Sequence, residues 1–234
     1  CDVVHAVEEL REELYEPQAD GIGALSEVSY EMRNEGFMDA SQVQYVARAG
    51  NYAAHGYAYH GALRILKVIM GYEYLWNNVR VKGGAYGCMN QYLRNGDVYF
   101  VSYRDPNLAA TNEVYEKIPD YVRNFTADED EMTKYIIGTV SDLDAPLNPS
   151  AKGARAMTAY LQGLTYEEIQ KERDEILGAT DADIRAFGGL LEAVLSDGAF
   201  CVVGGEEVLR RNSEMFLHLE PVTQRAETAE EGIE

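Results

Sequence analysis

The chain has 234 residues, of which 46% are hydrophobic and 26% are charged, a composition typical of a folded globular protein. Its 40 acidic residues outnumber its 20 basic ones, and the formal charge of −20 argues against nucleic acid and anionic membrane surfaces as partners. The three cysteines lie far apart and form no paired framework, so we expect reduced thiols and a cytoplasmic protein.

Residues 1–34 carry few of the patterns expected of a packed domain. Val4 to Leu14 predicts a short acidic helix, which Pro17 and the following QADGIG sequence end. We expect 1–34 to form a linker or the tail of a preceding unit. The N-terminus has no basic n-region and no apolar h-region, so we do not expect a signal peptide there. It also lacks an initiator methionine, and we expect a piece of a longer chain. No apolar run approaches the roughly 20 residues that cross a bilayer.

The patterns of a folded domain begin with a strand and a long helix. Val43, Tyr45 and Ala47 alternate with polar residues, which predicts a strand that ends near Gly50. The segment 62–79 predicts a mostly buried helix, because its apolar residues recur at helical spacing. These apolar residues are Leu63, Leu66, Ile69, Met70, Leu75 and Val79.

A hairpin follows the long helix. Asn95 and Gly96 form a strong two-residue turn signal between two runs rich in β-forming residues. The sequence therefore predicts an antiparallel pair of strands at about 86–94 and 97–104.

The second half of the chain has mainly helical patterns. We expect Asn107 to cap a helix through Glu116, after which Pro119 interrupts that helix or starts another. Further helices are expected at about 128–143 and over SAKGARAMTAYLQG, which ends at Gly163.

Two helix-starting signals come next in the sequence. Thr165 with Glu168 forms a capping box, and Thr180 with Asp183 forms a looser one because Asp takes the place of Glu. The AFCVVGG sequence after them predicts a short buried strand.

This order of elements indicates an α+β fold, with one sheet that includes a hairpin and helices packed on one face. We expect a single domain over 35–220. Residues 221–234 are rich in acidic side chains, and we expect them to form a disordered tail.

The HAVEE sequence, His5 to Glu9, nearly spells the zinc-binding pattern H-x-x-E-H, but Glu9 stands where the second histidine is required. A weak metal contact on one helix face is an alternative, and a solvated helix end is the favoured interpretation. The remaining histidines, His55, His60 and His218, form no ligand cluster in the sequence. We therefore expect no metal site in this chain.

The VRVKGGAYG sequence between the long helix and the hairpin is the strongest candidate site. It lacks the GK[ST] ending of a phosphate-binding loop. The hydroxyl of Tyr86 suits a hydrogen bond to a carbonyl oxygen or an oxyanion, and Arg80 offers a rigid fork of donors. Gly83 and Gly84 would let a substrate backbone approach closely. The alternative is an ordinary helix-to-strand connection with Tyr86 in the core.

Several long blocks of the sequence resemble one family. RVKGGAYG, FVSYRDPNL from Phe100, TKYIIGTVSDLDAPLNPSAKG from Thr133, QKERDEIL from Gln170 and the CVVGG strand are similar to the last quarter of presequence-protease-type metallopeptidases. These enzymes belong to the pitrilysin/insulinase superfamily. The resemblance covers roughly 35–219, most of the chain.

The resemblance implies four homologous α+β domains in two halves that enclose a chamber for unfolded peptides. Zinc is expected in the first domain on an inverted H-x-x-E-H motif, which this chain lacks, so the cofactor belongs to the complete enzyme. Arg80 and Tyr86 match an arginine and a tyrosine that reach the substrate beside the metal. By this analogy Tyr86 bonds the scissile carbonyl or the oxyanion, and Arg80 holds the nearby substrate backbone.

The resemblance also implies two partners, a peptide substrate and the N-terminal zinc-bearing half of the same protein. This chain alone is then expected to be inactive, because the metal and the general base lie elsewhere. The alternative is a catalytically silent peptide-binding or interaction domain of the same fold.

Overall fold

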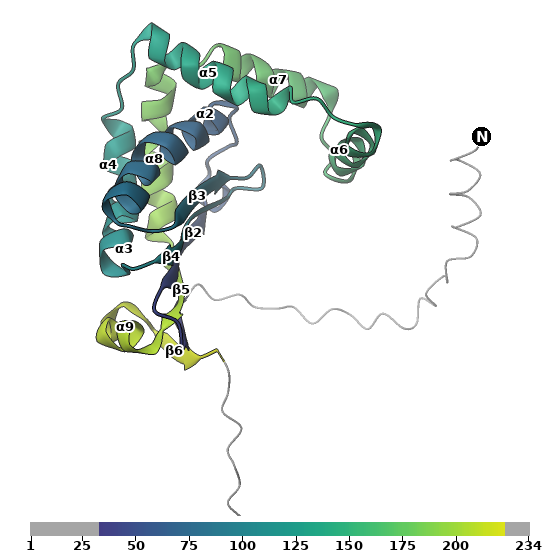
Figure 1. The fold of residues 1–234 in the computed structure, drawn as a ribbon. Helices are drawn as coiled ribbons and strands as arrows, with labels where there is room; N and C mark the ends of the chain where they lie inside the picture. The colour runs from purple at the N-terminus through teal and green to yellow at the C-terminus, as the bar shows by residue number, and fades with distance from the viewer. Residues whose placement is uncertain (1–32, 223–234) are drawn as a thin grey trace, which may run out of the picture. The chain divides into compact units, whose positions relative to one another are not determined.

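A computed structural model describes residues 33–222, in which six strands form one sheet in the order β3-β4-β2-β5-β1-β6 (Figure 1). The strands are β1 (Asn34–Asp39), β2 (Gln44–Asn51), β3 (Gly87–Tyr92), β4 (Asp97–Asp105), β5 (Ala199–Gly205) and β6 (His218–Pro221). Strand β2 pairs antiparallel with β4 and β5, and β3 pairs antiparallel with β4. Strand β1 runs parallel to both β5 and β6, and β3 forms one edge of the sheet.

The helices follow the predicted order. They are α2 (Ala62–Ile69), α3 (Ala109–Glu116), α4 (Ile118–Arg123), α5 (Glu129–Leu143), α6 (Pro149–Leu161), α7 (Tyr166–Leu177), α8 (Asp181–Ser196) and α9 (Glu206–Arg211). Helix α2 continues through two π-helical segments, Met70–Tyr74 and Trp76–Lys82, so the predicted helix at 62–79 is confirmed. Its six predicted apolar residues are all buried.

The core lies between one face of the sheet and the helices. Val46, Phe100, Phe200 and Val202 face the helices and are fully or almost fully buried. Figure 1 shows α2, α3, α4 and α8 on this side of the sheet. These contacts confirm an α+β fold with one sheet and helices packed against it.

The opposite face of the sheet carries apolar side chains that are only partly buried. The strand register places Ala47, Val101 and Met89 side by side on this face, with Tyr45 one pair further along β2. The exposed fractions of Tyr45 and Met89 are 46% and 47%. The alternation that predicted β2 therefore lies on this open face, while Val46 and the polar Gln44 point into the core.

The local signals of the sequence were largely correct. The hairpin is confirmed, and the capping boxes at Thr165 and Thr180 start α7 and α8. The cap predicted at Asn107 is wrong, because α3 begins after Leu108 without a side-chain cap. Strands β1 and β6 were not predicted.

Some sequence predictions lie outside the described residues. These are the helix at 4–14, the HAVEE sequence, and most of the segments 1–34 and 221–234. The domain boundaries at 35 and 220 stay predictions; the first and last described strands begin at Asn34 and end at Pro221.

Candidate functional site

Two of the three glycines of the VRVKGGAYG sequence, Gly83 and Gly84, end the long helix. Gly84 has a φ of +80°, a left-handed conformation that favours glycine at a helix end. Its N–H donates to the Arg80 carbonyl at 2.9 Å, and the N–H of Ala85 donates to the Val79 carbonyl at 3.2 Å. A Cβ on Gly83 would lie 2.5 Å from the Val79 carbonyl oxygen. The helix end thus gives both glycines a local reason, and their contact with a substrate stays a prediction.

Tyr86 lies immediately before β3, with its ring held and its hydroxyl free. Its exposed fraction is 62%, so the alternative that placed it in the core is wrong. Its N–H donates to the Arg104 carbonyl at 3.3 Å, and its ring meets the Tyr103 ring edge-on with centroids 5.7 Å apart. A Cβ on Gly87 would lie 2.3 Å from the Tyr103 ring, so a larger residue there would displace that ring from its present position. Among residues 33–222, none donates to or accepts from the Tyr86 hydroxyl.

Arg104 is a neighbour of Tyr86 that the sequence analysis missed. Its guanidinium lies over the Tyr86 ring, 5.6 Å from the centroid. Arg104 has a φ of +48°, and the register of β2 against β4 shifts between Gln44 and Val46, opposite this residue. Such a bulge redirects a side chain that regular pairing would point elsewhere. The bulge therefore aims a positive charge at the ring of Tyr86.

The side chain of Arg80 packs against a different residue from those that contact Tyr86. It lies in the last turn of the second π-helical segment, and its guanidinium stacks over the Trp76 ring at 4.0 Å from the centroid. Trp76 is one helical turn earlier, so the stacking fixes the direction of the exposed Arg80 side chain. No contact within the described part of the chain joins Arg80 to Tyr86. One short loop separates the two residues, with Arg80 at its helix end and Tyr86 at its strand end.

Cys88 lies close to the same loop but is unsuited to nucleophilic chemistry. Burial raises the pKa of its thiol to about 11, against the opposing effect of the positive charge of Arg80. The thiol therefore stays protonated at neutral pH, and the thiolate is the nucleophilic form.

A buried carboxylate fixes the glycine loop from the other side. Asp105 is fully buried, and its carboxylate accepts from the Asn107 N–H at 2.9 Å and from the Thr111 hydroxyl at 2.7 Å. The Asn107 side chain in turn donates to the Gly83 carbonyl. This contact explains why Asn107 does not cap α3. The sequence RDPN therefore connects the end of β4, the glycine loop and the first turn of α3.

The described residues do not fit a zinc ion. No group of three or more His, Cys, Asp or Glu side chains within 33–222 is placed to hold a metal. His55 pairs with Asp197, and His60 lies 3.8 Å from Glu175. The third described histidine, His218, contacts Arg33.

Comparisons with known proteins show what the chain as a whole is similar to. The family model for the PreP C-terminal domain matches residues 34–205. The chain is 47% identical over 190 residues to "Protein HypA" of Clostridium perfringens, covering 81% of this chain and 20% of that protein. It is 36% identical over 185 residues to "Presequence protease 1, chloroplastic/mitochondrial" of Arabidopsis thaliana, covering 78% of this chain and 17% of that protein.

A solved structure extends the likeness to the fold. The peptidase M16 inactive domain from Pseudomonas fluorescens superposes with a TM-score of 0.55 at 14% identity, covering 78% of this chain and 46% of that one. The chain spans about a fifth of the length of the curated relatives it matches. Among the described residues, none of the helices is long and apolar enough to cross a membrane.

Proposed function

The chain belongs to the PreP C-terminal domain family, and from this premise we propose that it is the zinc-free C-terminal domain of a zinc metalloendopeptidase. The complete enzyme would degrade unfolded peptides in a closed chamber. The proposed partners are the peptide substrate and the N-terminal zinc-bearing half of the same protein. The large share of each curated relative that lies beyond the matched region supports this arrangement.

The proposed role of Tyr86 is to donate a hydrogen bond to the scissile carbonyl oxygen as it becomes an oxyanion. The observation that carries this role is a free, exposed hydroxyl on a ring that Tyr103 and Arg104 hold in place. A donor that is fixed before the reaction stabilises developing charge without reorganisation at that moment. The positive charge of Arg104 over the ring adds to this electrostatic preference.

The proposed role of Arg80 is to hold the substrate backbone next to the reacting bond. Stacking on Trp76 leaves the guanidinium N–H groups free for peptide carbonyls or for a carboxylate. The open face of the sheet, with Tyr45 and Met89, offers apolar contact to an unfolded peptide.

The chain by itself is proposed to be inactive, since its described residues do not fit the metal. We propose a cytoplasmic location, which two free thiols, Cys88 and Cys201, support. The names of the relatives called presequence protease place those proteins in mitochondria or chloroplasts.

Replacing Tyr86 by Phe in the complete enzyme tests the proposal. We expect kcat to fall about 10²–10³-fold, the scale for removing one oxyanion donor, with peptide KM little changed. The matched control is Tyr72→Phe, at a tyrosine that is 73% exposed, which should leave kcat unchanged. Full kcat in Tyr86→Phe would instead favour a catalytically silent domain, a kind that the inactive domain from Pseudomonas fluorescens represents in this fold.

A further inference from the structure

A large groove lies at the other end of β3 from Tyr86. It has a volume of about 1110 Å³ and is bounded by the hairpin turn, α2, α6 and α7. Its lining contains five of the chain's 20 basic residues but only one of its 40 acidic residues. The basic residues are Arg64, Arg94, Lys152, Arg155 and Arg173. In a chain with a charge of −20, this local excess of positive charge stands out against the background.

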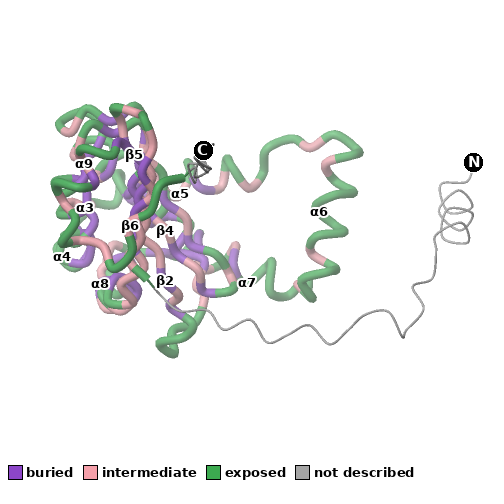
Figure 2. The backbone as a smooth tube through the Cα atoms, turned by 90° about the horizontal axis from the view of Figure 1, so that it is seen from below, coloured by how far each residue is buried: buried purple, intermediate pink, exposed green. Residues whose placement is uncertain are grey.

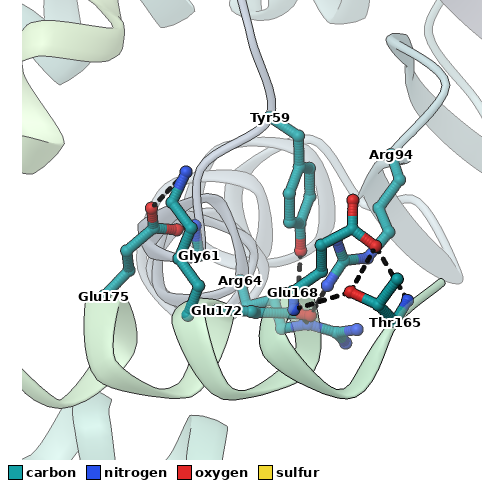
Figure 3. A network of polar contacts seen from close by, with 9 residues as sticks. Tyr59, Gly61, Arg64, Arg94, Thr165, Glu168, Glu172 and Glu175 are labelled. Atoms are coloured by element: carbon teal, nitrogen blue, oxygen red, sulfur yellow. Dashed lines mark hydrogen bonds and ion pairs between the residues drawn. The ribbon is translucent and has the colours of Figure 1, made fainter.

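The single acidic residue of the groove organises two of the arginines. Glu172 is 7% exposed, and its carboxylate accepts from Arg64 and Arg94, as well as from the Tyr59 hydroxyl at 2.8 Å (Figure 3). Arg94 also stacks on the Tyr59 ring at 4.5 Å. Each guanidinium has five N–H donors, so donors remain after these contacts. Glu172 thus holds two arginines in place at the groove without using up their binding capacity.

The cations on the opposite wall form no direct ion pair with the described part of the chain, although the charge of Arg155 adds to the larger effect of Arg173 in lowering the pKa of Asp144. Lys152 and Arg155 come from α6, and among the described residues neither forms an ion pair. Arg155 donates only to the Leu143 carbonyl, at 3.2 Å. Arg173 differs, because it forms a double hydrogen bond with Asp144. Two cations that form no direct ion pair with the described residues therefore line the groove. They come from a helix that buries none of its own residues (Figure 2).

The rest of the lining is largely apolar. Leucine, alanine and isoleucine side chains also line the groove; they are Leu143, Leu147, Ala156, Ala159, Leu164 and Ile169. A small inorganic anion would leave this apolar surface uncovered. A peptide that carries carboxylates among apolar side chains matches both parts of the lining, and the volume exceeds that of most small-molecule sites.

We propose that this basic groove binds an acidic segment of the peptide substrate. The length of β3 sets the distance between this segment and the cleaved bond. Arg94 lies eight residues after Tyr86, with β3 between them. At about 3.3 Å per residue this corresponds to about 26 Å. An extended peptide with its reacting bond at Tyr86 would place residues about eight positions away in the groove. The link to cleavage rests on the proposed function, whereas peptide binding by the groove does not.

Binding can be measured by fluorescence anisotropy on the 234-residue chain. The probe is a fluorescein-labelled ten-residue peptide in which glutamate alternates with leucine or alanine. We expect saturable binding that Lys152→Ala/Arg155→Ala weakens about three- to tenfold, the scale for losing two solvent-exposed charge contacts. The matched control is Arg210→Ala/Arg211→Ala, which removes two exposed cations from α9 and should leave the affinity unchanged. Equal weakening by both double variants, or no binding by the wild type, would overturn the proposal.

Two further probes define the ligand class. A peptide with lysine in place of glutamate should not bind. Inorganic tripolyphosphate should compete only weakly, because it covers none of the apolar lining. Competition by tripolyphosphate as strong as that of the unlabelled acidic peptide would show a general anion site and contradict a peptide site.

The distance is tested in the complete enzyme. Substrates carry three glutamates centred either eight or four residues from the cleaved bond, on either side. We expect a lower KM, at unchanged kcat, for the eight-residue spacing on one side, and we expect Lys152→Ala/Arg155→Ala to abolish the advantage. Equal KM at both spacings would overturn the distance. The Tyr86→Phe measurement changes kcat and not peptide binding to the groove, so failure of either proposal is seen separately.

Discussion

The Tyr86 site and the basic groove stand at opposite ends of β3 and are built by different means. Around Tyr86, backbone hydrogen bonds, a left-handed glycine and the buried Asp105 fix each part. Across the groove, by contrast, α6 has no buried residue and is mostly exposed (Figure 2). A hydrogen bond to a transition state requires accurate placement, whereas attraction between charges acts over longer distances. Under the proposed roles, the more closely fixed of the two regions is the one in which geometry would decide the rate.

The largest expected effect comes from removing the buried carboxylate behind the Tyr86 loop. Asp105→Ala leaves the buried Thr111 hydroxyl and the partly buried Asn107 N–H without their acceptor. We expect the free energy of unfolding to fall by about 2–4 kcal/mol in urea denaturation, because unpaired buried donors are costly. Asp142→Ala, at an exposed acid of α5, is the control and should change it by less than about 0.5 kcal/mol. A loss of less than about 1 kcal/mol for Asp105→Ala would show that the loop does not depend on this carboxylate.

Replacing a glycine by alanine should lower stability at the Tyr86 loop and raise it in α6. Gly84→Ala places a Cβ at a φ of +80° and should cost about 1–2 kcal/mol of unfolding free energy. Gly153→Ala, inside α6 with no atom within 4 Å of the new Cβ, should stabilise that helix by up to about 1 kcal/mol. Chemical denaturation measures the first effect.

Hydrogen exchange in α6 measures the second effect, because a helix without buried residues opens locally. Destabilisation by both alanines would contradict the contrast between the two regions.

Local signals explain how much of the fold the sequence could predict. Thr165 with Glu168 and Thr180 with Asp183 act within one helical turn, so their capping boxes could be recognised and are confirmed. Strand β1 owes its place to parallel partners more than 160 residues away in the chain, of which Asn34 and Phe200 are one pair. No pattern in its own six residues indicates such a partner.

The residues of the candidate site also fall into those that local signals predict and those that depend on distant partners. Tyr86 was predicted to begin a strand and lies immediately before β3, because the helix end and the hairpin turn that frame it are local features. Arg104 was missed because its bulge depends on the register against β2. Asn107 resembled a helix cap, but its side chain bonds the Gly83 carbonyl, 24 residues away. The groove was also missed, since its cations come from separate elements of the fold.

The smallest expected effect comes from Asp144→Asn, which tests whether the charge of Arg173 or its fixed position matters for binding in the groove. Two hydrogen bonds from Arg173, at 2.8 and 2.6 Å, hold the pKa of Asp144 below its ordinary value of 3.8. A depressed pKa means that the pair stabilises the fold above the unfolded-state pKa and loses this contribution as the pH falls through the folded-state pKa. Asp144→Asn should therefore lower Tm slightly at pH 7, and the difference from the wild type should vanish at acidic pH.

The same variant frees Arg173 to contact a ligand in the groove. If charge governs binding there, Asp144→Asn should tighten binding of the acidic peptide about twofold in the anisotropy measurement. This gain is expected although the contact between Arg173 and Asp144 is weakened. The control Asp142→Asn removes an equal charge from an exposed position of α5 that does not line the groove, and it should change the affinity less. Weaker binding by Asp144→Asn would mean that the placement of Arg173 matters more than its free charge, and the groove would then resemble the Tyr86 site.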